Sequence, residues 1–101
     1  MIIYNVTIKV DLSIAATWLN WLKQEHIPDI LSTNCFYEAQ IYHLLESEEE
    51  DGITYAVQYF ARNIEDYNRY LADYSTTLRK KAIDKWPDQF LTFRSVLELV
   101  H

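Results

Sequence analysis

Hydrophobic and polar residues alternate with a period of two in four stretches of this chain, and two further stretches have helical spacing. The alternation predicts four strands, over Ile2–Val10, Cys35–Glu46, Ile53–Ala61 and Phe90–Val100. One helix is expected after Ser13 and another between Asn63 and Trp86. The predicted order is therefore strand, helix, strand, strand, helix, strand.

The first helical stretch carries two of the three tryptophans in a wide apolar stripe, which is typical of a helix that covers a sheet. Ser13 is a plausible N-cap, because its hydroxyl can accept a hydrogen bond from a free amide of the first turn. Pro28 disfavours α geometry at the residue before it. We therefore expect a kink or break at His26-Ile27-Pro28, followed by a short turn over 29–32.

The boundaries of the other elements also carry local signals. Asn63 is the predicted N-cap of the second helix, and Trp86-Pro87 closes it. The acidic run Glu46–Asp51 reads as a solvated hairpin tip, since it lacks the ligand pattern of a calcium loop. Gly52 is the only glycine and stands where a hairpin most needs a positive φ angle.

With right-handed crossovers, this order of elements predicts a ferredoxin-like βαββαβ fold of the α+β class. We expect a four-stranded antiparallel sheet in the order 4-1-3-2, with both helices on one face. Residues 1–101 are expected to form a single domain, because the chain contains no repeat, linker or low-complexity segment.

Composition excludes several classes of protein. A net charge of −6 argues against a binder of nucleic acid, which needs clustered Lys and Arg. The single cysteine rules out an internal disulfide framework, and the single glycine rules out the glycine-dependent nucleotide and nucleophile motifs. No metal ligand set, cofactor motif or catalytic residue is identified. A soluble cytoplasmic protein without a membrane segment is expected.

The sheet face that the helices leave uncovered is predicted to be apolar and to form a homodimer, sheet against sheet. Four strands ~4.8 Å apart and ~20–30 Å long present a face of roughly 400–600 Å². That is a large apolar patch for a monomer to expose, and with strand exchange at its edges it approaches a stable interface. Its predicted apolar members are Phe36, Tyr42, Leu44, Ala56, Phe60, Val96 and Val100.

Four polar residues, one from each strand, are assigned to this open face: Asn5, Gln40, Gln58 and Arg94. Two interpretations remain open. They can pair with each other, with glutamates or with water and set the register of the dimer. Alternatively, they line a ligand site in which Arg94 holds an anionic or enolate oxygen, Tyr42 forms one wall and His26 lies near the entrance.

His26 and the tyrosines also allow two interpretations each. His26 either donates a hydrogen bond that fixes the kink or lies at the mouth of a pocket. The eight tyrosines are more than a core of this size needs. They form either a packing layer with hydroxyls at its rim or the lining of an aromatic cavity.

Trp18, Trp21 and the run His26-Ile27-Pro28, followed by Phe36, Tyr55-Ala56-Val57-Gln58-Tyr59 and Phe93-Arg94, resemble the DUF4286 family of uncharacterised bacterial proteins. More broadly, the topology resembles the dimeric α/β-barrel superfamily, where some EthD-like proteins carry a similar aromatic–His–x–Pro run. Members of that superfamily include cofactor-free monooxygenases, isomerases and haem-degrading enzymes. The predicted helix over 64–86 has no His, Cys or Met to hold a haem iron.

The resemblance leaves three classes of function open. The first is a small-molecule-binding or regulatory module. The second is a cofactor-free monooxygenase or isomerase that acts on an aromatic or polyketide-like metabolite. The third is a structural or protein-interaction role. Fold alone does not choose between them.

Overall fold

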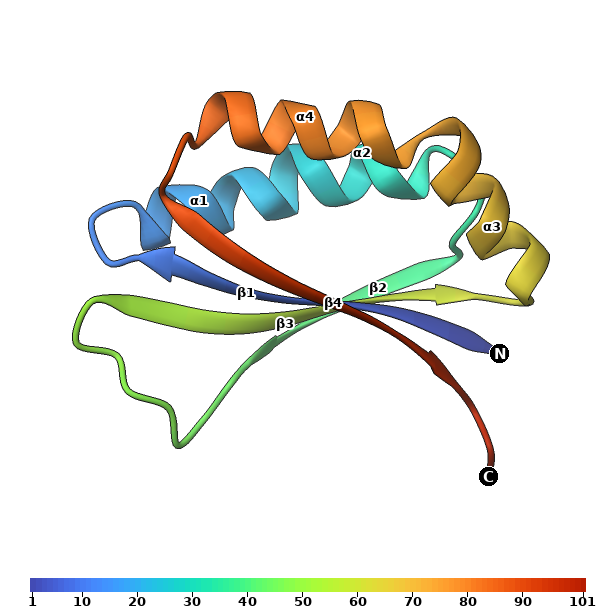
Figure 1. Ribbon diagram of the computed structural model, residues 1–101, viewed down its shortest axis with the longest axis horizontal. Coiled ribbons are helices and arrows are strands. Elements are labelled where there is room, and N and C mark those ends of the chain that lie inside the picture. The colour runs from blue at the N-terminus through green and yellow to red at the C-terminus, as the bar shows by residue number, and fades with distance from the viewer.

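The computed structural model describes residues 1–101 as a four-stranded sheet with all helices on one face (Figure 1). The strands are ordered β2-β3-β1-β4 and every neighbouring pair is antiparallel, which confirms the predicted ferredoxin-like arrangement. The elements are β1 (Ile2–Asp11), α1 (Ala15–Trp21), η1 (Leu22–His26), α2 (Ile27–Leu31), β2 (Glu38–His43), β3 (Gly52–Ala61), α3 (Ile64–Asp73), α4 (Ser75–Lys85) and β4 (Phe90–Glu98).

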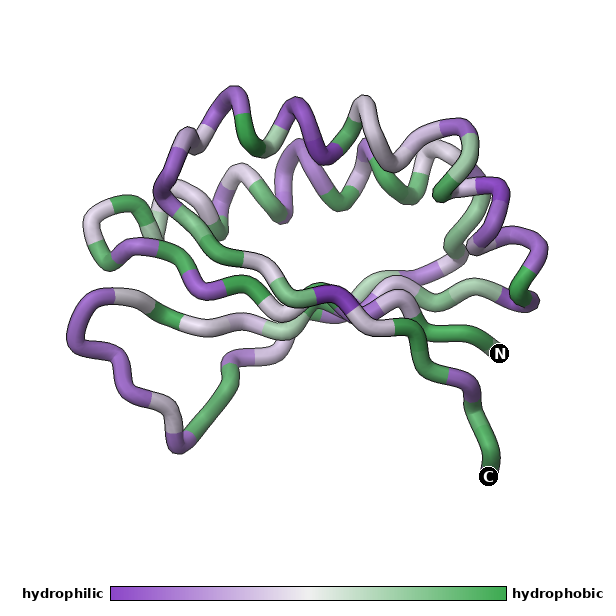
Figure 2. Tube along the Cα trace, in the orientation of Figure 1, coloured by the Kyte–Doolittle hydropathy of each residue, from purple (hydrophilic) through white to green (hydrophobic).

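The two central strands carry the core. Every second residue of β1, from Ile2 to Val10, is buried against the helices. The register pairs Tyr4 with Tyr59 and Val6 with Val57, so apolar residues of β3 continue the same face. Along the backbone, apolar positions on the strands alternate with polar ones, whereas the loop before β3 is mostly hydrophilic (Figure 2).

The first helical stretch is not broken at His26-Ile27-Pro28. Between α1 and α2 the helix widens to a π turn, η1, in which the amide of Ile27 donates to the carbonyl of Leu22. A wider turn suits Pro28, which has no amide hydrogen and would clash with the preceding turn of a regular α-helix. The helix therefore continues to Leu31, and the expectation of a break was wrong.

The second helical stretch is divided where one continuous helix was predicted. Tyr74 has φ −129° and ψ −32°, outside the α region, and separates α3 from α4. Ser75 Oγ donates to the carbonyl of Leu71 at 2.9 Å, which satisfies an acceptor at this break. The predicted N-cap is confirmed, since Asn63 Oδ1 accepts from the amide of Asp66 at 2.9 Å.

Other boundary predictions fail for local reasons. Ser13 lies in a turn, and helix α1 begins after Ile14 without a side-chain cap. Strand β2 is shorter than predicted, because it pairs with β3 only from Glu38 to His43. Gly52 does not have a positive φ; it pairs with Asp11, and a Cβ there would lie 2.7 Å from the carbonyl oxygen of Val10. Glycine is required here by close packing rather than by turn geometry.

Each residue of the outer strand β4 lies on the opposite face of the sheet from the one predicted. Arg94 pairs with Val6 and Thr92 pairs with Ile8, so both lie on the helix side of the sheet. Leu91, Phe93, Ser95 and Leu97 consequently lie on the open face. Both sets of alternate residues in this strand are partly apolar, and its own pattern therefore does not distinguish the two faces. The assignment of Arg94 to the open face was wrong.

Candidate functional site

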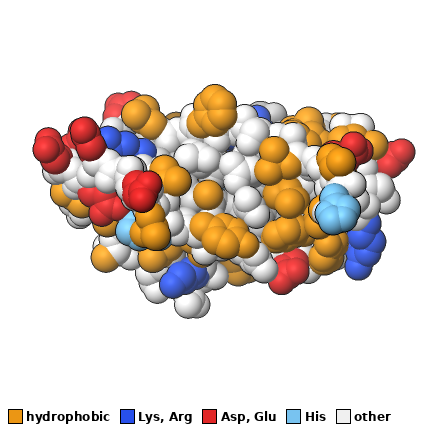
Figure 3. All heavy atoms as spheres, turned by 90° about the horizontal axis from the view of Figure 1, so that it is seen from below, with side chains coloured by type: hydrophobic (Ala, Val, Ile, Leu, Met, Phe, Trp, Pro, Cys, Tyr) orange, Lys and Arg blue, Asp and Glu red, His pale blue; other side chains and the backbone are white.

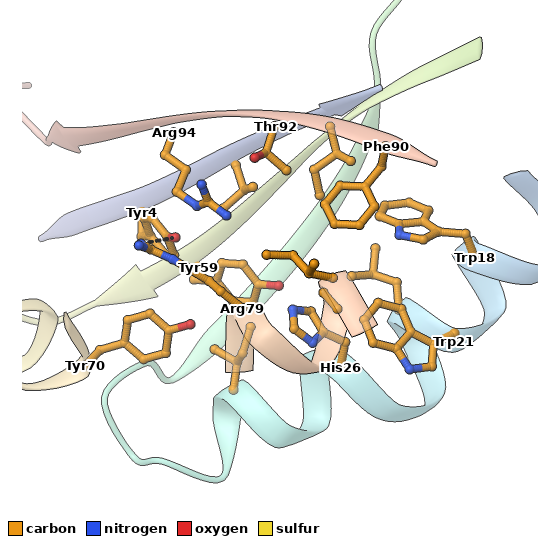
Figure 4. Close-up of a pocket in the computed structure, with 16 residues that line it drawn as sticks. Tyr4, Trp18, Trp21, His26, Tyr59, Tyr70, Arg79, Phe90, Thr92 and Arg94 are labelled. Atoms are coloured by element: carbon orange, nitrogen blue, oxygen red, sulfur yellow. Dashed lines mark hydrogen bonds between the residues drawn. The ribbon is translucent and has the colours of Figure 1, made fainter. Parts of the chain in front are cut away.

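A cavity of about 160 Å³ lies between the sheet and the helical layer, on the side of the edge strand β4 (Figure 4). Of its 16 lining residues, 12 are hydrophobic, and the polar groups are few. A concave, mostly apolar site with a few polar groups is the usual form of a small-molecule site. Its main labelled residues are Tyr4, Trp18, Trp21, His26, Tyr59, Tyr70, Arg79, Phe90, Thr92 and Arg94.

Strand alternation and helical spacing bring these side chains together from across the chain. The floor consists of alternate residues of β1, β3 and β4, and the roof comes from α1, η1, α2, α3 and α4. The predicted interpretation of the tyrosines as cavity lining holds for Tyr59 and Tyr70, and Tyr4 joins them. On the edge strand, the polar residues Thr92 and Arg94 pair with the apolar residues Ile8 and Val6 of β1, so the lining becomes more polar on this side.

One end of the cavity is cationic. Arg79 of α4 donates from Nη2 to the hydroxyl of Tyr4 at 3.0 Å. Arg79 Nε is buried and has no hydrogen-bond partner. Arg94 extends from β4 to the same end, where Tyr59 and Tyr70 also lie, whereas Trp18, Trp21 and Phe90 lie at the other end (Figure 4). The cavity therefore has a charged end and an aromatic end.

Burial also changes the acidity of the tyrosine hydroxyls. Desolvation raises the pKa of Tyr70 and that of Tyr59 above the usual range. At Tyr70 the positive charges of Arg79 and Arg94 act in the opposite direction and partly offset this increase in pKa. These phenols are therefore neutral hydrogen-bonding groups near pH 7.

His26 lies in the wall of the cavity at the end of the π turn. Its ring stacks on Trp21, with ring centroids 4.7 Å apart, and its Nδ1 is buried without a hydrogen-bond partner. The expected hydrogen bond that would fix a kink is therefore not made through Nδ1. Burial lowers the pKa of His26 to about 4, against the opposing effect of Asp29, so the imidazole is neutral near pH 7.

His26 and Trp21 also border a second, polar depression on the other side of the helical layer. Its remaining lining residues are Glu25, Asp29, Lys81, Asp84 and Lys85. The salt bridge between Lys81 Nζ and Asp29 Oδ2, at 3.7 Å, spans this depression and links α4 to α2. His26 and Trp21 thus separate the apolar cavity from this charged depression.

The low pKa of His26 predicts a pH dependence of stability. The group is neutral in both states above pH 6.5, so its full contribution is present there. As the pH falls, the unfolded state binds the proton first and the free energy of unfolding decreases. At about 1.4 kcal/mol per pH unit, the loss reaches roughly 3 kcal/mol near pH 4.

Urea denaturation of the native protein and of His26→Phe at pH 7 and pH 4.5 measures this effect. We expect His26→Phe to lose less stability between the two pH values, by roughly 2–3 kcal/mol. His101→Phe, at an exposed histidine that makes no ion pair, is the matched control and should behave as the native protein does. Equal losses in all three proteins would show that His26 is solvated.

The open face of the sheet carries a polar row in its centre. Gln40, Gln58, Asn5 and Ser95 are consecutive neighbours across β2, β3, β1 and β4. Asn5 Nδ2 donates to Ser95 Oγ at 3.4 Å, Gln58 Nε2 donates to Asn5 Oδ1 at 3.3 Å, and Tyr42 donates to Gln40. These polar groups pair with each other, as one of the two interpretations predicted.

Apolar side chains flank this row on both sides. In the view onto the open face they are spread around the central polar region, whereas most charged side chains lie toward the periphery (Figure 3). Phe93 and Leu91 are 72% and 74% exposed, which is unusual for residues of that size. The remaining large apolar residues of this face include Ile3, Tyr42, Phe60 and Leu97.

The six residues predicted for a ligand site thus separate into two groups. His26 and Arg94 line the cavity on the helix side, whereas Asn5, Gln40, Tyr42 and Gln58 lie on the opposite face of the sheet. Sequence reasoning missed Arg79. The available signal was the weak apolar stripe of α4. Because apolar residues do not clearly mark one side of this helix, a polar residue next to the buried Leu78 can also face the sheet.

Other chemical groups do not form a second site. Cys35 is a buried free thiol whose Sγ lies 3.8 Å from the carbonyl of Thr33. No three histidine, cysteine or acidic side chains are grouped closely enough to hold a metal ion. None of the helices has the length and hydrophobicity needed to cross a membrane.

Comparison of the sequence with known protein families gives a match. The model of a domain of unknown function (DUF4286) matches residues 1–100. No curated protein matches the chain by sequence.

Solved structures share the fold at very low sequence identity. A dimeric ferredoxin-like protein from an uncultured marine organism has a TM-score of 0.76 at 7% identity, with 99% of this chain and 95% of that chain covered. An EthD family protein from Bacillus halodurans has a TM-score of 0.65 at 10% identity, covering 98% and 100%. SnoaB, a cofactor-independent oxygenase from Streptomyces nogalater, has a TM-score of 0.62 at 9% identity, covering 99% and 94%.

Proposed function

Since the chain belongs to the DUF4286 family, whose function is unknown, we propose from its geometry that it is a homodimeric module that binds a small aromatic molecule. The observation that carries this proposal is the cavity of about 160 Å³ lined by tryptophan, tyrosine and phenylalanine. Apolar cavities of about 150 Å³ in other proteins bind benzene, so this volume suits a ligand with one ring or a compact pair of rings. Binding would take place within each protomer.

The open face supports the homodimer. Helices cover the other face, and the exposed apolar residues on either side of the polar row would be buried by a second copy. The marine protein of the same fold is described as dimeric. In such a dimer, the row of Asn5, Gln40, Gln58 and Ser95 would favour one register, because a shifted partner would place apolar side chains against polar groups.

A cofactor-free oxygenase or isomerase is the second candidate, and His26 favours it. Its Nδ1 is buried without a hydrogen-bond partner and the ring lines the cavity, and a general base needs a free lone pair. A pKa of about 4 makes this imidazole a weak base, which is why binding without catalysis is preferred. Oxygen consumption by the native protein with a hydroxylated naphthalene, and its loss in His26→Phe, would favour the enzyme.

A cavity-filling variant tests the binding proposal. Thr92→Phe places a ring in the cavity from β4, where an aromatic residue suits a strand. In a thermal-shift screen with indole and 2-naphthol at millimolar concentration, we expect the native protein to be stabilised by a few degrees and Thr92→Phe not to be. Thr76→Phe, at an exposed position of α4, is the matched control and should respond as the native protein does.

Two results would contradict this proposal. One is the absence of any shift in the native protein with one-ring and two-ring compounds. The other is an equal shift in Thr92→Phe, which would mean that the compounds bind elsewhere. NMR spectra of the native protein with each compound identify which residues respond. Lining residues such as Tyr59 should shift most.

A further inference from the structure

We infer that the ligand is an aromatic anion whose carboxylate, or a similar planar oxyanion, is held by Arg79 and Arg94 while its ring lies against Trp18, Trp21 and Phe90. This inference rests on the proposed function, because it concerns the same cavity, and it adds the chemical class of the ligand. It depends on where the arginines of the chain find partners, on the two distinct ends of the cavity, and on its volume.

The arginines fall into two groups. Arg69 pairs with Asp66 at 3.3 Å and donates to two backbone carbonyls, and Arg62 lies over the ring of Tyr37 at 5.0 Å. In contrast, neither Arg79 nor Arg94 takes part in any of the five ion pairs. The sequence has 15 acidic residues against nine lysines and arginines, so carboxylates are not scarce. The two guanidinium groups that line the cavity are thus the arginines that make neither an ion pair nor a cation–π contact.

Their position near each other is unfavourable without an anion. Arg79 of α4 and Arg94 of β4 both line the cavity and lie at the same end of it (Figure 4). Like charges in a partly buried site repel each other more strongly than they do in water. Folding alone would be served by an apolar residue at either position. A bound oxyanion would offset the repulsion and accept a hydrogen bond from the unpartnered Nε of Arg79.

Arginine is suited to this role by its geometry. Its planar fork binds carboxylates through two parallel hydrogen bonds, and it stays charged at all physiological pH values. Arg79 is half-buried and is oriented by Tyr4, whereas Arg94 is exposed at the mouth of the cavity. Arg79 is therefore expected to contribute more to affinity, and Arg94 to contribute more to the rate of capture.

The other end of the cavity determines how such a ligand lies. Trp18, Trp21 and Phe90 offer ring faces and edges and no charged group (Figure 4). A ring placed there would have its anionic substituent toward the arginines. A volume of about 160 Å³ suits a benzoate-sized molecule.

Matched probes test the charge requirement. Benzoate and benzamide have nearly the same shape and differ in charge, so calorimetric or NMR titration of both separates charge from ring binding. We expect benzoate to bind at least tenfold more tightly than benzamide. Arg79→Gln, which keeps a polar side chain but removes the charge and the guanidinium fork, should weaken benzoate at least tenfold and leave benzamide unchanged. Arg79→Lys should retain part of the affinity for benzoate, because it keeps the charge but loses the fork.

Arg94→Gln should weaken benzoate severalfold, and this loss should diminish at high salt because Arg94 is exposed. Arg62→Gln, at an exposed arginine outside the cavity, is the control and should change neither titration. Far-UV circular dichroism of each variant establishes that it is folded.

The outcomes separate this inference from the proposed function. Equal affinity for benzoate and benzamide, with no effect of either cavity arginine, overturns the anion inference and leaves a site for neutral aromatic molecules. Binding of neither probe, together with no response in the indole and naphthol screen, overturns both. Weak benzoate binding that Arg62→Gln reduces as much as Arg79→Gln does would show nonspecific attraction to surface charge and overturn the inference.

Discussion

Phe93→Asp is expected to convert the proposed dimer into a monomer of 12.1 kDa in sedimentation experiments at tens of micromolar. Phe93 is 72% exposed on the open face, between Leu91 and the polar row. A second copy that covers this face would bury two unpaired carboxylates, one from each protomer. At roughly 3 kcal/mol for a buried charge without a partner, the dissociation constant should rise at least 100-fold.

The fold of the protomer should tolerate this change, because Phe93 does not touch the core in a single copy. An unchanged far-UV spectrum would confirm that only assembly is affected. Leu12→Asp, at an exposed leucine in the turn after β1, is the matched control and should remain dimeric. A native protein that sediments at 12.1 kDa under the same conditions would remove the dimer from the proposal.

Trp18→Ala is expected to have the largest effect on stability of any substitution in the core. Trp18 is 2% exposed and stacks on Tyr55, with ring centroids 5.8 Å apart. Its removal would leave an enlarged void beside the existing cavity, and truncation of a buried tryptophan costs about 3–5 kcal/mol. Because domains of this size are stable by only about 5–15 kcal/mol, the variant should be marginally folded.

Urea denaturation at a fixed protein concentration measures this loss, since dimer formation would make apparent stability depend on concentration. Thr17→Ala, at the neighbouring exposed position of α1, is the control and should change the free energy of unfolding by less than about 0.5 kcal/mol. A loss below about 1 kcal/mol for Trp18→Ala would mean that the helix α1 does not depend on this contact. Trp18→Ala should also fail to bind aromatic ligands, because Trp18 lines the cavity.

Both predictions depend on which face of the sheet each residue occupies, and the strands differ in how far their own sequence determines this. In β1 the two faces are unlike, since Ile2, Tyr4, Val6 and Ile8 alternate with more polar residues. In β4 both faces carry large apolar residues, because one packs toward the helices and the other belongs to the exposed apolar face. A pattern of period two predicts a strand in either case, but it distinguishes the faces only in β1.

The candidate site shows the same limit. Arg94 and His26 were expected at one site on the open face, whereas the cavity that both of them line is on the helix side of the sheet. Arg79 lies 75 residues from its partner Tyr4, and no local spacing relates the two. Neither helical periodicity nor strand alternation contains the information that α4 lies over β1 and β4 at that point.

The sequence by itself determined the order of elements, the core of the central strands, the N-cap at Asn63 and the resemblance to the DUF4286 family. These features depend on contacts between residues close in the chain, whose geometry the backbone restricts to a few choices. Only the tertiary structure decided which face of the sheet each residue of β4 occupies, that a π turn precedes Pro28, and that Arg79 and Arg94 line the same cavity. Each of these depends on how distant segments pack, because that packing sets the cross-strand register and decides which side chains share a cavity.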